Sequence, residues 1–554
     1  MVIYQVFTRL FGADGKMLVP NGSKAHNGCG TMADFTPKAL REIKALGATH
    51  VWYTGIIEHA TKTDYSAFGI RRDNPCVVKG EAGSPYAIKD YYDVDPDIAT
   101  DVTKRMKEFE HLIARTHKAG MGVIMDFVPN HVAREYHSDA KPKGVKDLGE
   151  GDDTSLHFSN QNNFYYLWDR LHMDNLNEAP EFRGTYIEVP AKATGNDMFS
   201  EGPSVNDWYE TVKLNYGVDV ADGRKCYFDP IPNTWLKMTD ILLFWAGKGI
   251  EGFRCDMAEM VPVEFWHYAI AKVKEKYPGI IFIAEIYNPD AYRCYIQYGG
   301  FDYLYDKVGL YDTLKNVIAG ASVHDITRAW QAVDDIRVHM LNFLENHDEQ
   351  RIASDFFAGD AKKGRAALLV SALMDRNPYM QYFGQALGEK GMDEEGFSGR
   401  DGRTTIFDYW KVDTVSRWRN GGKFGDKRLT EDEKSLKEFT QKVLNAKNDE
   451  TALSEGDFYD LMYVNGHLQR QYAFLRHKGK DVCLVVANFA DHYYRASVNL
   501  PEHVFEFLGL EKSDSLCATD LITGKEVDIA WTPEKPVEVD LKAYNGIILK
   551  LKQL

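Results

Sequence analysis

The feature that most constrains the fold is a regular alternation of short apolar runs with amphipathic helical stretches. Residues 122–128 are apolar apart from Asp126, as in a parallel strand that is covered on both faces. A helical stretch that ends at Gly120 precedes this run, and its apolar face consists of Met106, Phe109, Leu112 and Ile113. Strands that alternate with covering helices are typical of the α/β class.

Eight such runs can be counted along the chain. They cover residues 3–7, 49–53, 122–128, 252–256, 280–285, 301–305, 340–344 and 379–382. Helical stretches separate them, and one of these begins after Thr36, which can cap it, and ends near Leu46. Eight βα units are the number found in a (β/α)8 TIM barrel. We therefore predict a barrel formed by residues 1–131 and 229–450.

Two parts of the chain break this rhythm. Residues 132–228 contain no tidy βα unit and are polar and rich in aromatic rings, which predicts a small domain inserted after the third strand. Residues 451–554 contain short strands between turn signals, at 472–475, 482–486 and 546–551. This pattern predicts an antiparallel β-sandwich that follows the barrel.

Composition and charge exclude several classes of function. The 82 acidic and 66 basic residues give a formal net charge of −16, which disfavours nucleic-acid binding because the surface repels phosphates. No apolar stretch approaches the ~18 residues of a membrane span. The chain also lacks the nucleotide-binding GxxxxGK[ST] and zinc-binding HExxH patterns.

Cysteine usage bears on the cellular compartment. The seven cysteines are scattered and form no CxxC pair, so the sequence indicates neither a disulfide framework nor a zinc ribbon. With a strand predicted at residues 3–7 and no leader before it, we expect a cytoplasmic protein. A secreted chain from which the leader had been trimmed would show the same sequence features.

Four of the apolar runs end in polar side chains. These are Asp126, Arg254 with Asp256, Glu285, and Asn346-His347-Asp348. A single Asp at a strand end is most often a helix cap, but four such ends on one barrel rim are hard to explain in that way. Carboxylates that converge on one cleft indicate acid–base and nucleophilic chemistry, and glycoside hydrolysis needs one ionised and one protonated carboxyl.

The neighbours of two carboxylates suggest different roles for them. Arg254 lies two residues before Asp256, so both side chains point to the same face of the strand. An adjacent guanidinium lowers a carboxyl pKa, which favours Asp256 as the nucleophile. Glu285 follows an apolar strand and has no basic neighbour within several residues, and an apolar setting raises the pKa as a general acid requires.

The strand-end motifs together resemble those of the α-amylase family, glycoside hydrolase family 13. The motifs are Asp126-Phe-Val-Pro-Asn130-His131, Gly252-Phe-Arg254-Cys-Asp256, the strand that ends in Glu285, and Phe343-Leu-Glu-Asn346-His347-Asp348. Their order, their spacing and the insertion after the third strand all match the family. The resemblance covers nearly the whole chain.

The resemblance implies a catalytic trio and a reaction. Asp256 would be the nucleophile, and Glu285 would be the general acid and then the base. Asp348 would bind sugar hydroxyls and help to distort the ring. The substrate would be an α-1,4-linked glucan such as starch or maltodextrin, with no cofactor for catalysis. The α-anomer would be retained, with the Asp256 and Glu285 carboxyls ~5–5.5 Å apart.

The resemblance also implies which residues bind the sugar. Arg254 would orient the nucleophile, His131 and His347 would hydrogen-bond the sugar at the point of cleavage, and Asp126 would support that subsite. Tyr86 matches the family's stacking tyrosine. The rings of the inserted segment, Phe164 to Trp168 with Trp208 and Tyr209, can equally form further stacking surfaces or that domain's own core.

Asn130 corresponds to a ligand of the family's structural Ca²⁺, which makes such an ion possible here. The loop around Asp14 and Asn21 is a second candidate calcium site, although an ordinary turn explains it more simply.

Some positions depart from the family pattern. Glu259 and Met260 replace a common Lys-His pair that helps to shape the leaving-group side, so the acceptor stays open. Ala87 replaces the Asp that exo-acting α-glucosidases commonly have. A transglycosylase of the same family and a non-catalytic carbohydrate-binding protein are therefore alternatives to a hydrolase.

Overall fold

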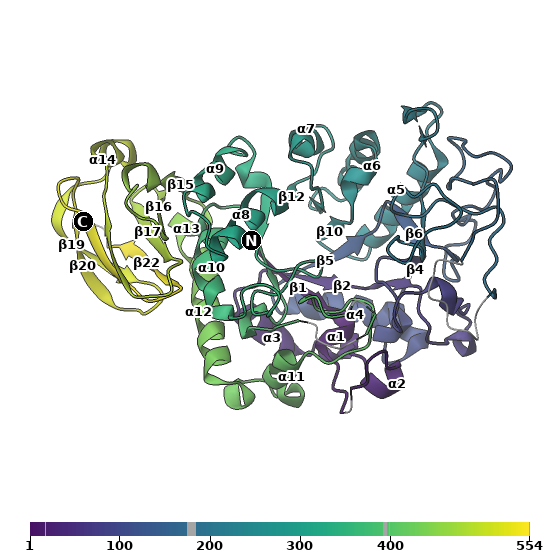
Figure 1. The fold of residues 1–554 in the computed structure, drawn as a ribbon, viewed down its shortest axis with the longest axis horizontal. Coiled ribbons are helices and arrows are strands. Elements are labelled where there is room, and N and C mark those ends of the chain that lie inside the picture. Colours follow the sequence, from purple (N-terminus) through teal and green to yellow (C-terminus); the bar gives the residue numbers. More distant parts are fainter. Residues whose placement is uncertain (17, 174–183, 392–395, 398, 553–554) are drawn as a thin grey trace.

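Eight parallel strands close into a barrel at the centre of the molecule (Figure 1). The computed structural model describes residues 1–16, 18–173, 184–391, 396–397 and 399–552. The barrel strands are β1 (Val2–Phe7), β2 (His50–Thr54), β5 (Gly122–Phe127), β10 (Gly252–Cys255), β11 (Ile281–Ala284), β12 (Tyr303–Tyr305), β13 (Met340–Phe343) and β14 (Tyr379–Tyr382). They pair in this order, and β14 pairs with β1 to close the ring. The predicted (β/α)8 barrel is confirmed.

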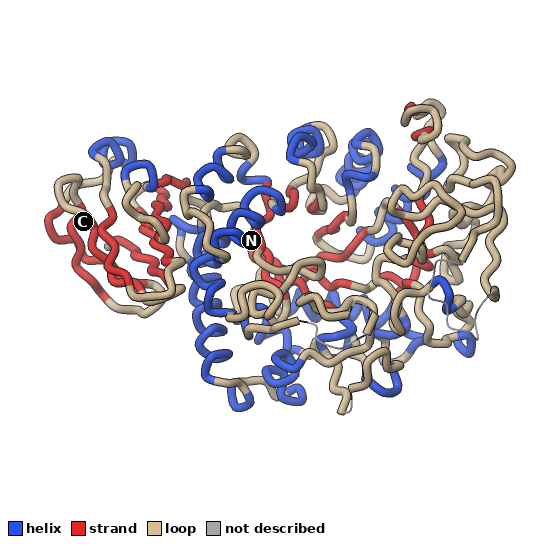
Figure 2. Tube along the Cα trace, viewed as in Figure 1, coloured by secondary structure: helices blue, strands red, loops and turns tan. Residues whose placement is uncertain are grey.

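Helices surround these strands (Figure 2). Those within the barrel sequence are α1 (Thr8–Phe11), α2 (Lys24–Asn27), α3 (Pro37–Ala45), α4 (Arg105–Lys118), α5 (Asn233–Ala246), α6 (Val263–Lys276), α7 (Tyr292–Gln297), α8 (Asp312–Ile318), α9 (Asp325–Gln331), α10 (Gly364–Leu373), α11 (Asp413–Arg419) and α12 (Glu431–Asp449). Thr36 caps α3 as predicted, since its side chain accepts a hydrogen bond from the Ala39 amide at 3.2 Å. On α5 the Leu236 side chain is exposed, whereas Ile241, Leu242 and Trp245 are buried.

The barrel interior is filled by side chains that alternate with outward-facing ones along each strand. One inner cluster consists of Ile3, Trp52, Ile124, Ile283, Tyr305, Tyr311, Leu341, Phe343 and Met380. Two residues beyond Ile124 lies Asp126, and two residues beyond Ile283 lies Glu285. The period of two therefore places an acidic group directly above an apolar interior layer, at the carboxyl end of the barrel.

Two irregular segments extend the barrel on one side (Figure 2). The longer lies between β5 and α5 and contains the antiparallel pairs β6 (His131–Ala133) with β7 (Thr211–Lys213), and β8 (Val218–Asp219) with β9 (Lys225–Cys226). The shorter segment, which the sequence did not predict, contains the antiparallel pair of β3 (Ile57–His59) and β4 (Ile88–Val94). The domain limits proposed from the sequence stay a prediction.

The rings of the inserted segment divide between core and surface. Phe164, Tyr165 and Tyr166 are buried, whereas Trp168 is 79% exposed. Phe164 and Tyr166 belong to the main hydrophobic cluster that also contains barrel and helix residues. Most of this ring cluster is therefore a core rather than a sugar-binding wall.

The C-terminal part forms two antiparallel sheets at the opposite end of the molecule from the insertion (Figure 1). The larger has the order β15 (Asp457–Asp460), β16 (Gln471–Lys478), β17 (Asp481–Asn488), β22 (Asn545–Leu551), β19 (Ser513–Asp520) and β20 (Glu526–Trp531). The smaller pairs β18 (Tyr494–Val498) with β21 (Val537–Leu541). Helices α13 (Thr451–Ser454) and α14 (Glu502–Leu508) flank them. The side chains of both sheets share one hydrophobic cluster with α10 and α12, as predicted for a β-sandwich docked on the barrel.

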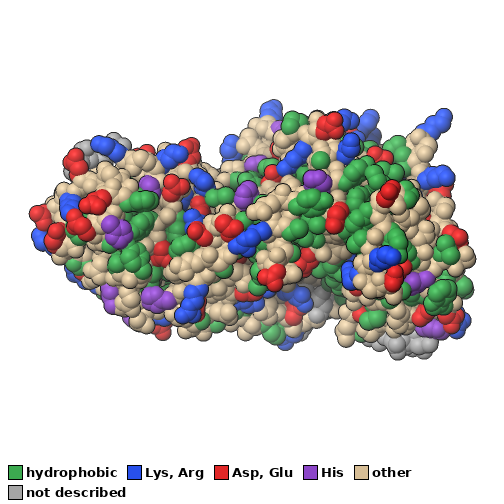
Figure 3. Space-filling view, turned by 90° about the horizontal axis from the view of Figure 1, so that it is seen from above, with side chains coloured by type: hydrophobic (Ala, Val, Ile, Leu, Met, Phe, Trp, Pro, Cys, Tyr) green, Lys and Arg blue, Asp and Glu red, His purple; other side chains and the backbone are tan. Residues whose placement is uncertain are grey.

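Acidic and basic side chains are interspersed over the face seen in Figure 3. Among the described residues, no helix combines the length and the apolar character needed to cross a membrane.

Candidate active site

A cavity of about 420 Å³ opens at the carboxyl ends of the barrel strands. Its volume lies within the ~300–1,000 Å³ range of small-molecule sites. The sequence-predicted residues that line it are Tyr86, His131, Asp256, Glu285, His347 and Asp348. Three carboxyl groups that the sequence placed on different strand ends therefore face one space.

Arg254 lies beneath this cavity and joins two of the three carboxylates. It is fully buried, and its Nη1 donates to Asp256 Oδ1 at 2.7 Å. Its Nη2 lies 2.8 Å from Glu285 Oε2, and its Nε donates to the Tyr305 hydroxyl at 3.1 Å. Because the guanidinium is planar, these contacts fix the two carboxyl groups relative to each other.

Glu285 has no basic neighbour close to it in the sequence, but the apolar setting expected from this is wrong because Arg254 reaches it from the adjacent strand. The Met257 amide also donates to Glu285 Oε2 at 2.8 Å, and the Tyr287 hydroxyl donates to Oε1 at 2.5 Å. Met257 has φ of +41°, a strained conformation for a side-chain-bearing residue, which turns its amide toward Glu285. Three donors thus hold this carboxylate in place.

Two of the three carboxyl groups, those of Asp256 and Asp348, have a raised pKa. Burial raises the pKa of Asp256 well above its usual value, the Arg254 charge opposes this rise, and Glu285 adds to it. The sequence-based expectation of a lowered Asp256 pKa is therefore wrong. The Asp348 side chain is 38% exposed to the cavity, yet desolvation and the Glu285 charge raise its pKa to about 7. The site therefore holds a carboxyl proton near neutral pH, on Asp348, and glycoside hydrolysis needs one protonated carboxyl.

Asp126 supports the site from behind. Its Oδ2 accepts a hydrogen bond from the Trp52 indole at 2.8 Å, and its Oδ1 lies 3.5 Å from Arg254 Nη1 and 3.4 Å from the Tyr86 hydroxyl. Burial raises the pKa of Asp126 to about 6, against the effect of Arg254. The side chain reaches the cavity residues through Arg254 and Tyr86, and the supporting role expected of it stays a prediction.

Tyr86 and His347 form one wall of the cavity. Their rings stack at 5.1 Å with an interplanar angle of 21°, and the Tyr86 hydroxyl lies 2.6 Å from His347 Nε2. The same nitrogen is 3.1 Å from Asp348 Oδ2, while His347 Nδ1 pairs with the Gln5 amide at 2.8 Å. Burial and the Arg254 charge lower the pKa of His347 well below its usual value, so this imidazole is neutral.

His131 lies on the insertion side of the cavity, at the start of β6. Burial and the charges of Lys213 and Lys79 lower its pKa to about 3, so it is neutral as well. The Trp208 ring contacts it, with ring centroids 5.1 Å apart, and Trp208 also lines the cavity. Among the described rings of the inserted segment, Trp208 is therefore the one that lines the cavity and can stack on a ligand.

Comparison with known proteins identifies the family. The profile described as "Alpha amylase, catalytic domain" matches residues 21–454, which is most of the chain. The chain belongs to the α-amylase family. "Alpha-amylase MalA" of Haloarcula japonica is 23% identical over 548 residues, which cover 97% of this chain and 60% of the relative. "Alpha-amylase 3" of Dictyoglomus thermophilum is 23% identical over 355 residues, which cover 61% of each protein.

The chain thus spans about 60% of the length of these two relatives. Among solved structures, the maltogenic α-amylase AmyB of Thermotoga neapolitana superposes with a TM-score of 0.63 at 18% identity, covering 100% of this chain and 99% of that one. This likeness shows that the fold is that of α-amylases. Membership of the family gives the chain the catalytic domain of α-amylases over residues 21–454.

Asn130, predicted as a ligand of the α-amylase family's structural Ca²⁺, has other partners here. Its Oδ1 accepts a hydrogen bond from the Lys213 ammonium, and its Nδ2 donates to the Gly195 carbonyl at 2.8 Å. The prediction is corrected, because a side-chain cation already lies against the side-chain oxygen that Asn130 would offer a metal. Asp14, in the second candidate loop, lies 3.3 Å from Arg419 Nη1.

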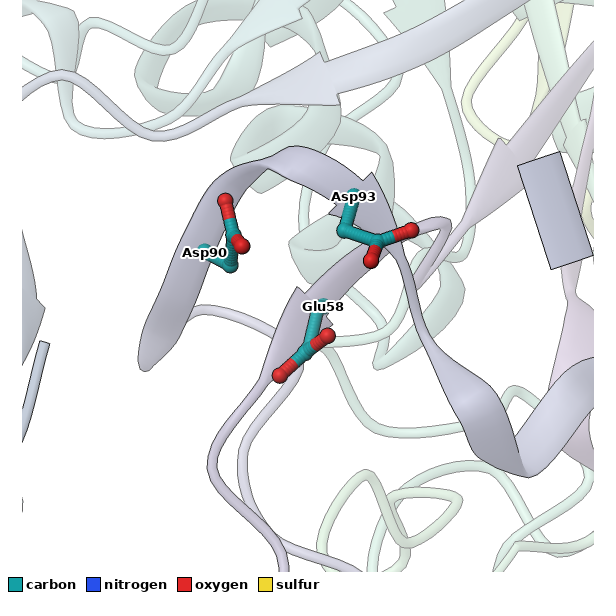
Figure 4. A group of neighbouring side chains, drawn as sticks. All are labelled: Glu58, Asp90 and Asp93. Carbon is teal, nitrogen blue, oxygen red and sulfur yellow. The ribbon is translucent and has the colours of Figure 1, made fainter. Parts of the chain in front are cut away.

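A buried acidic group outside the cavity has the ligand types that Ca²⁺ prefers. Glu58 on β3 and Asp90 and Asp93 on β4 bring carboxylate oxygens within 4.8 Å of one another (Figure 4). Lys89 Nζ lies 4.0 Å from Glu58 Oε1, and Arg105 pairs with Asp93. Because two cations already offset these charges, we assign no ion to this group.

Sequence reasoning missed several residues that shape the site. Gln5 and Trp52 are at inward positions of β1 and β2, and strict alternation along those strands would have found both. Tyr287 and Lys213 carry no comparable signal, because each reaches the site from an irregular segment or a short strand pair.

Proposed function

We propose that this chain is a retaining α-glycoside hydrolase that cleaves α-1,4-glucosidic bonds of starch- or maltodextrin-type glucans. The observation that carries the proposal is the Arg254 guanidinium, which contacts Asp256 at 2.7 Å and Glu285 at 2.8 Å below one cavity. Two carboxyls on one guanidinium favour the short separation of retaining enzymes, ~5–5.5 Å, over the ~6.5–9.5 Å of inverting ones.

In the proposed reaction, Asp256 attacks the anomeric carbon and forms a covalent glycosyl-enzyme, while Glu285 gives its proton to the departing glycosidic oxygen. Glu285 then takes a proton from water, and the resulting hydroxide displaces Asp256 to release a sugar with its original anomeric form. The chemistry uses carboxyl groups alone and calls for no cofactor. Because Arg254 holds both groups, neither has to reorient between the two steps.

The walls of the cavity fit a sugar ring. The neutral imidazole of His131 lines the cavity and can hydrogen-bond a sugar hydroxyl, whereas both nitrogens of His347 already contact protein groups. Asp348 faces the same space and accepts hydrogen bonds when ionised. Tyr86 and Trp208 offer aromatic faces of the kind that pack on the apolar face of a sugar.

The proposal is tested with Asp256→Asn and Glu285→Gln on maltoheptaose and starch, with release of reducing ends as the readout. Each variant should lose nearly all turnover, whereas Glu275→Gln, an exposed acid-to-amide change on α6, should keep it. Fold is checked by circular dichroism. Wild-type turnover in either active-site variant would refute the assignment.

The family also supports transfer to a sugar acceptor, since both reactions share the first step. Glu259, which replaces a residue of the common Lys-His pair, accepts hydrogen bonds from the Tyr287 and Asn288 amides at 3.2 and 3.0 Å. It therefore shapes the loop that follows Glu285, on the side where the acceptor enters. Products longer than a maltotriose substrate would assign transfer, and shorter products alone would assign hydrolysis.

We also propose that the enzyme works in the cytoplasm. The seven cysteines are scattered along the sequence and none forms a CxxC pair, as expected of a chain kept in a reducing compartment. Fractionation of the source cells with an antibody to the protein tests this proposal, and recovery from the medium alone would contradict it.

A further inference from the structure

A buried lysine side chain lies where the barrel meets the inserted segment. Lys213, on β7, carries its ammonium into a buried oxygen-lined position. The Nζ donates to Asn130 Oδ1, lies 2.7 Å from Asp197 Oδ1, and donates to the Met260 carbonyl at 3.3 Å. These are an amide oxygen, a carboxylate oxygen and a backbone carbonyl, which are also the ligand types of Ca²⁺.

This set does not fit a divalent ion together with Lys213. A Ca²⁺ ion takes six to eight oxygens at ~2.3–2.6 Å, so an ion on Asn130 would lie within a few ångströms of the ammonium. Two cations that close repel each other strongly in a buried setting. The Lys213 side chain is only 6% exposed, so it has little room to swing away into solvent.

The three oxygens belong to three separate segments. Asn130 follows β5, Asp197 lies on a loop of the insertion where its φ of +59° is strained, and Met260 closes the turn after the nucleophile Asp256. The ammonium therefore joins the insertion to the loop that carries the proposed nucleophile. It also lies beside His131, whose register partner on β6 is Lys213 itself.

We propose that Lys213 is a built-in replacement for the structural metal at this position. In this proposal the Lys213 ammonium organises the insertion and the nucleophile turn, so the wild-type enzyme needs no divalent ion there. Lys213 acts as a positioning residue, because it touches Asn130, Asp197 and Met260 and does not line the cavity.

The first test compares Lys213→Met with Lys225→Met, which removes an exposed lysine from β9 of the same insertion. Removal of one partner from a buried ion pair should lower the melting temperature of Lys213→Met by roughly 3–4 °C if the chain unfolds as one unit. The kcat should fall about tenfold, and both values should be unchanged in Lys225→Met. Lys213→Met with wild-type melting and wild-type kcat would overturn the proposal.

The second test restores the missing cation. Lys213→Ala leaves a cavity lined by the same oxygens, and ethylammonium chloride supplies an N–H donor of the right charge. Ethylammonium should raise the kcat of Lys213→Ala and leave the wild type unchanged. Tetramethylammonium, which has the charge but no N–H group, should have no such effect, and equal responses to the two salts would overturn the requirement for a donor.

The third test counts calcium directly, by isothermal titration with CaCl2 after treatment with EDTA. Asp197→Asn removes the carboxylate and keeps Lys213, so it should bind the same number of calcium ions as the wild type. One ion fewer in Asp197→Asn would show that Ca²⁺ occupies this position in the wild type and would overturn the proposal. Calcium bound elsewhere leaves both counts equal.

Discussion

Arg254→Lys is the sharpest perturbation of the proposed catalytic geometry. Lysine keeps the positive charge but has a single ammonium nitrogen in place of the planar guanidinium. It can therefore contact Asp256 or Glu285 but cannot hold both. The lost contact is a charge-assisted hydrogen bond of 2.7 or 2.8 Å. Such a bond contributes about 1.5–3 kcal/mol, which corresponds to a roughly 10- to 150-fold lower kcat if it acts in the transition state.

Arg254→Met removes the positive charge as well as the paired N–H donors, so its comparison with Arg254→Lys isolates the effect of the charge. Arg254 lowers the pKa of both Asp256 and Asp348, opposing the effect of burial. Removal of its charge therefore raises these pKa values, and a smaller fraction of the nucleophile is ionised at a given pH. The acid limb of the pH–kcat profile should move to higher pH in Arg254→Met, and much less in Arg254→Lys.

The assay is kcat on maltoheptaose from pH 4 to 9, with the melting temperature as the check on folding. Arg293→Lys is the matched control, because Arg293 forms a bidentate contact with Asp335 at an exposed site away from the cavity. It should leave kcat and the profile unchanged. The reasoning would be refuted if Arg254→Lys turned over at the wild-type rate, or if a folded Arg254→Met kept the wild-type acid limb.

Three further changes follow from the site and the core. Tyr287→Phe removes a hydrogen-bond donor from Glu285 and should lower kcat on maltoheptaose about 2- to 12-fold, wild-type kcat being the contrary result. Trp208→Ala should lower kcat/KM on maltoheptaose about 2- to 12-fold with little effect on the melting temperature, whereas a loss of folding would place Trp208 in the core instead. Burial lowers the pKa of His59 to about 3, so between pH 6.5 and 3 the unfolded chain binds a proton that the folded chain does not, and wild-type stability falls as the pH falls. Urea unfolding should therefore show His59→Gln gaining about 1.4 kcal/mol per pH unit relative to the wild type over that range, and a constant difference would contradict the neutral state of His59.

Local sequence pattern was enough to predict the barrel and most of the carboxylates in its cavity. Each apolar run became a strand because four to seven residues of alternating or continuous apolar character have few other ways to be buried. Asp126 and Glu285 both point toward the site because each lies two residues beyond an inward-facing isoleucine, although only Glu285 lines the cavity. These inferences depend only on neighbours along the chain.

The charge interactions and pKa values of the site could not be predicted from neighbours along the chain. Arg254 was assigned to Asp256 from their spacing, and its second contact, with Glu285 on the next strand, was missed. That contact depends on the strand register, which places Arg254 opposite Ile283. The raised pKa of Asp256 depends in turn on burial, which no single stretch of sequence specifies.

The sequence by itself determined which residue types would meet at the barrel rim, because covalent spacing fixes the period of a strand. The tertiary structure alone decided what those residues contact. Lys213 and Asn130 are 83 positions apart and meet because β6 and β7 pair in one register. This contact cannot be predicted from sequence separation, because it depends on how whole segments pack together. The packing places the Lys213 ammonium where a metal ion had been expected.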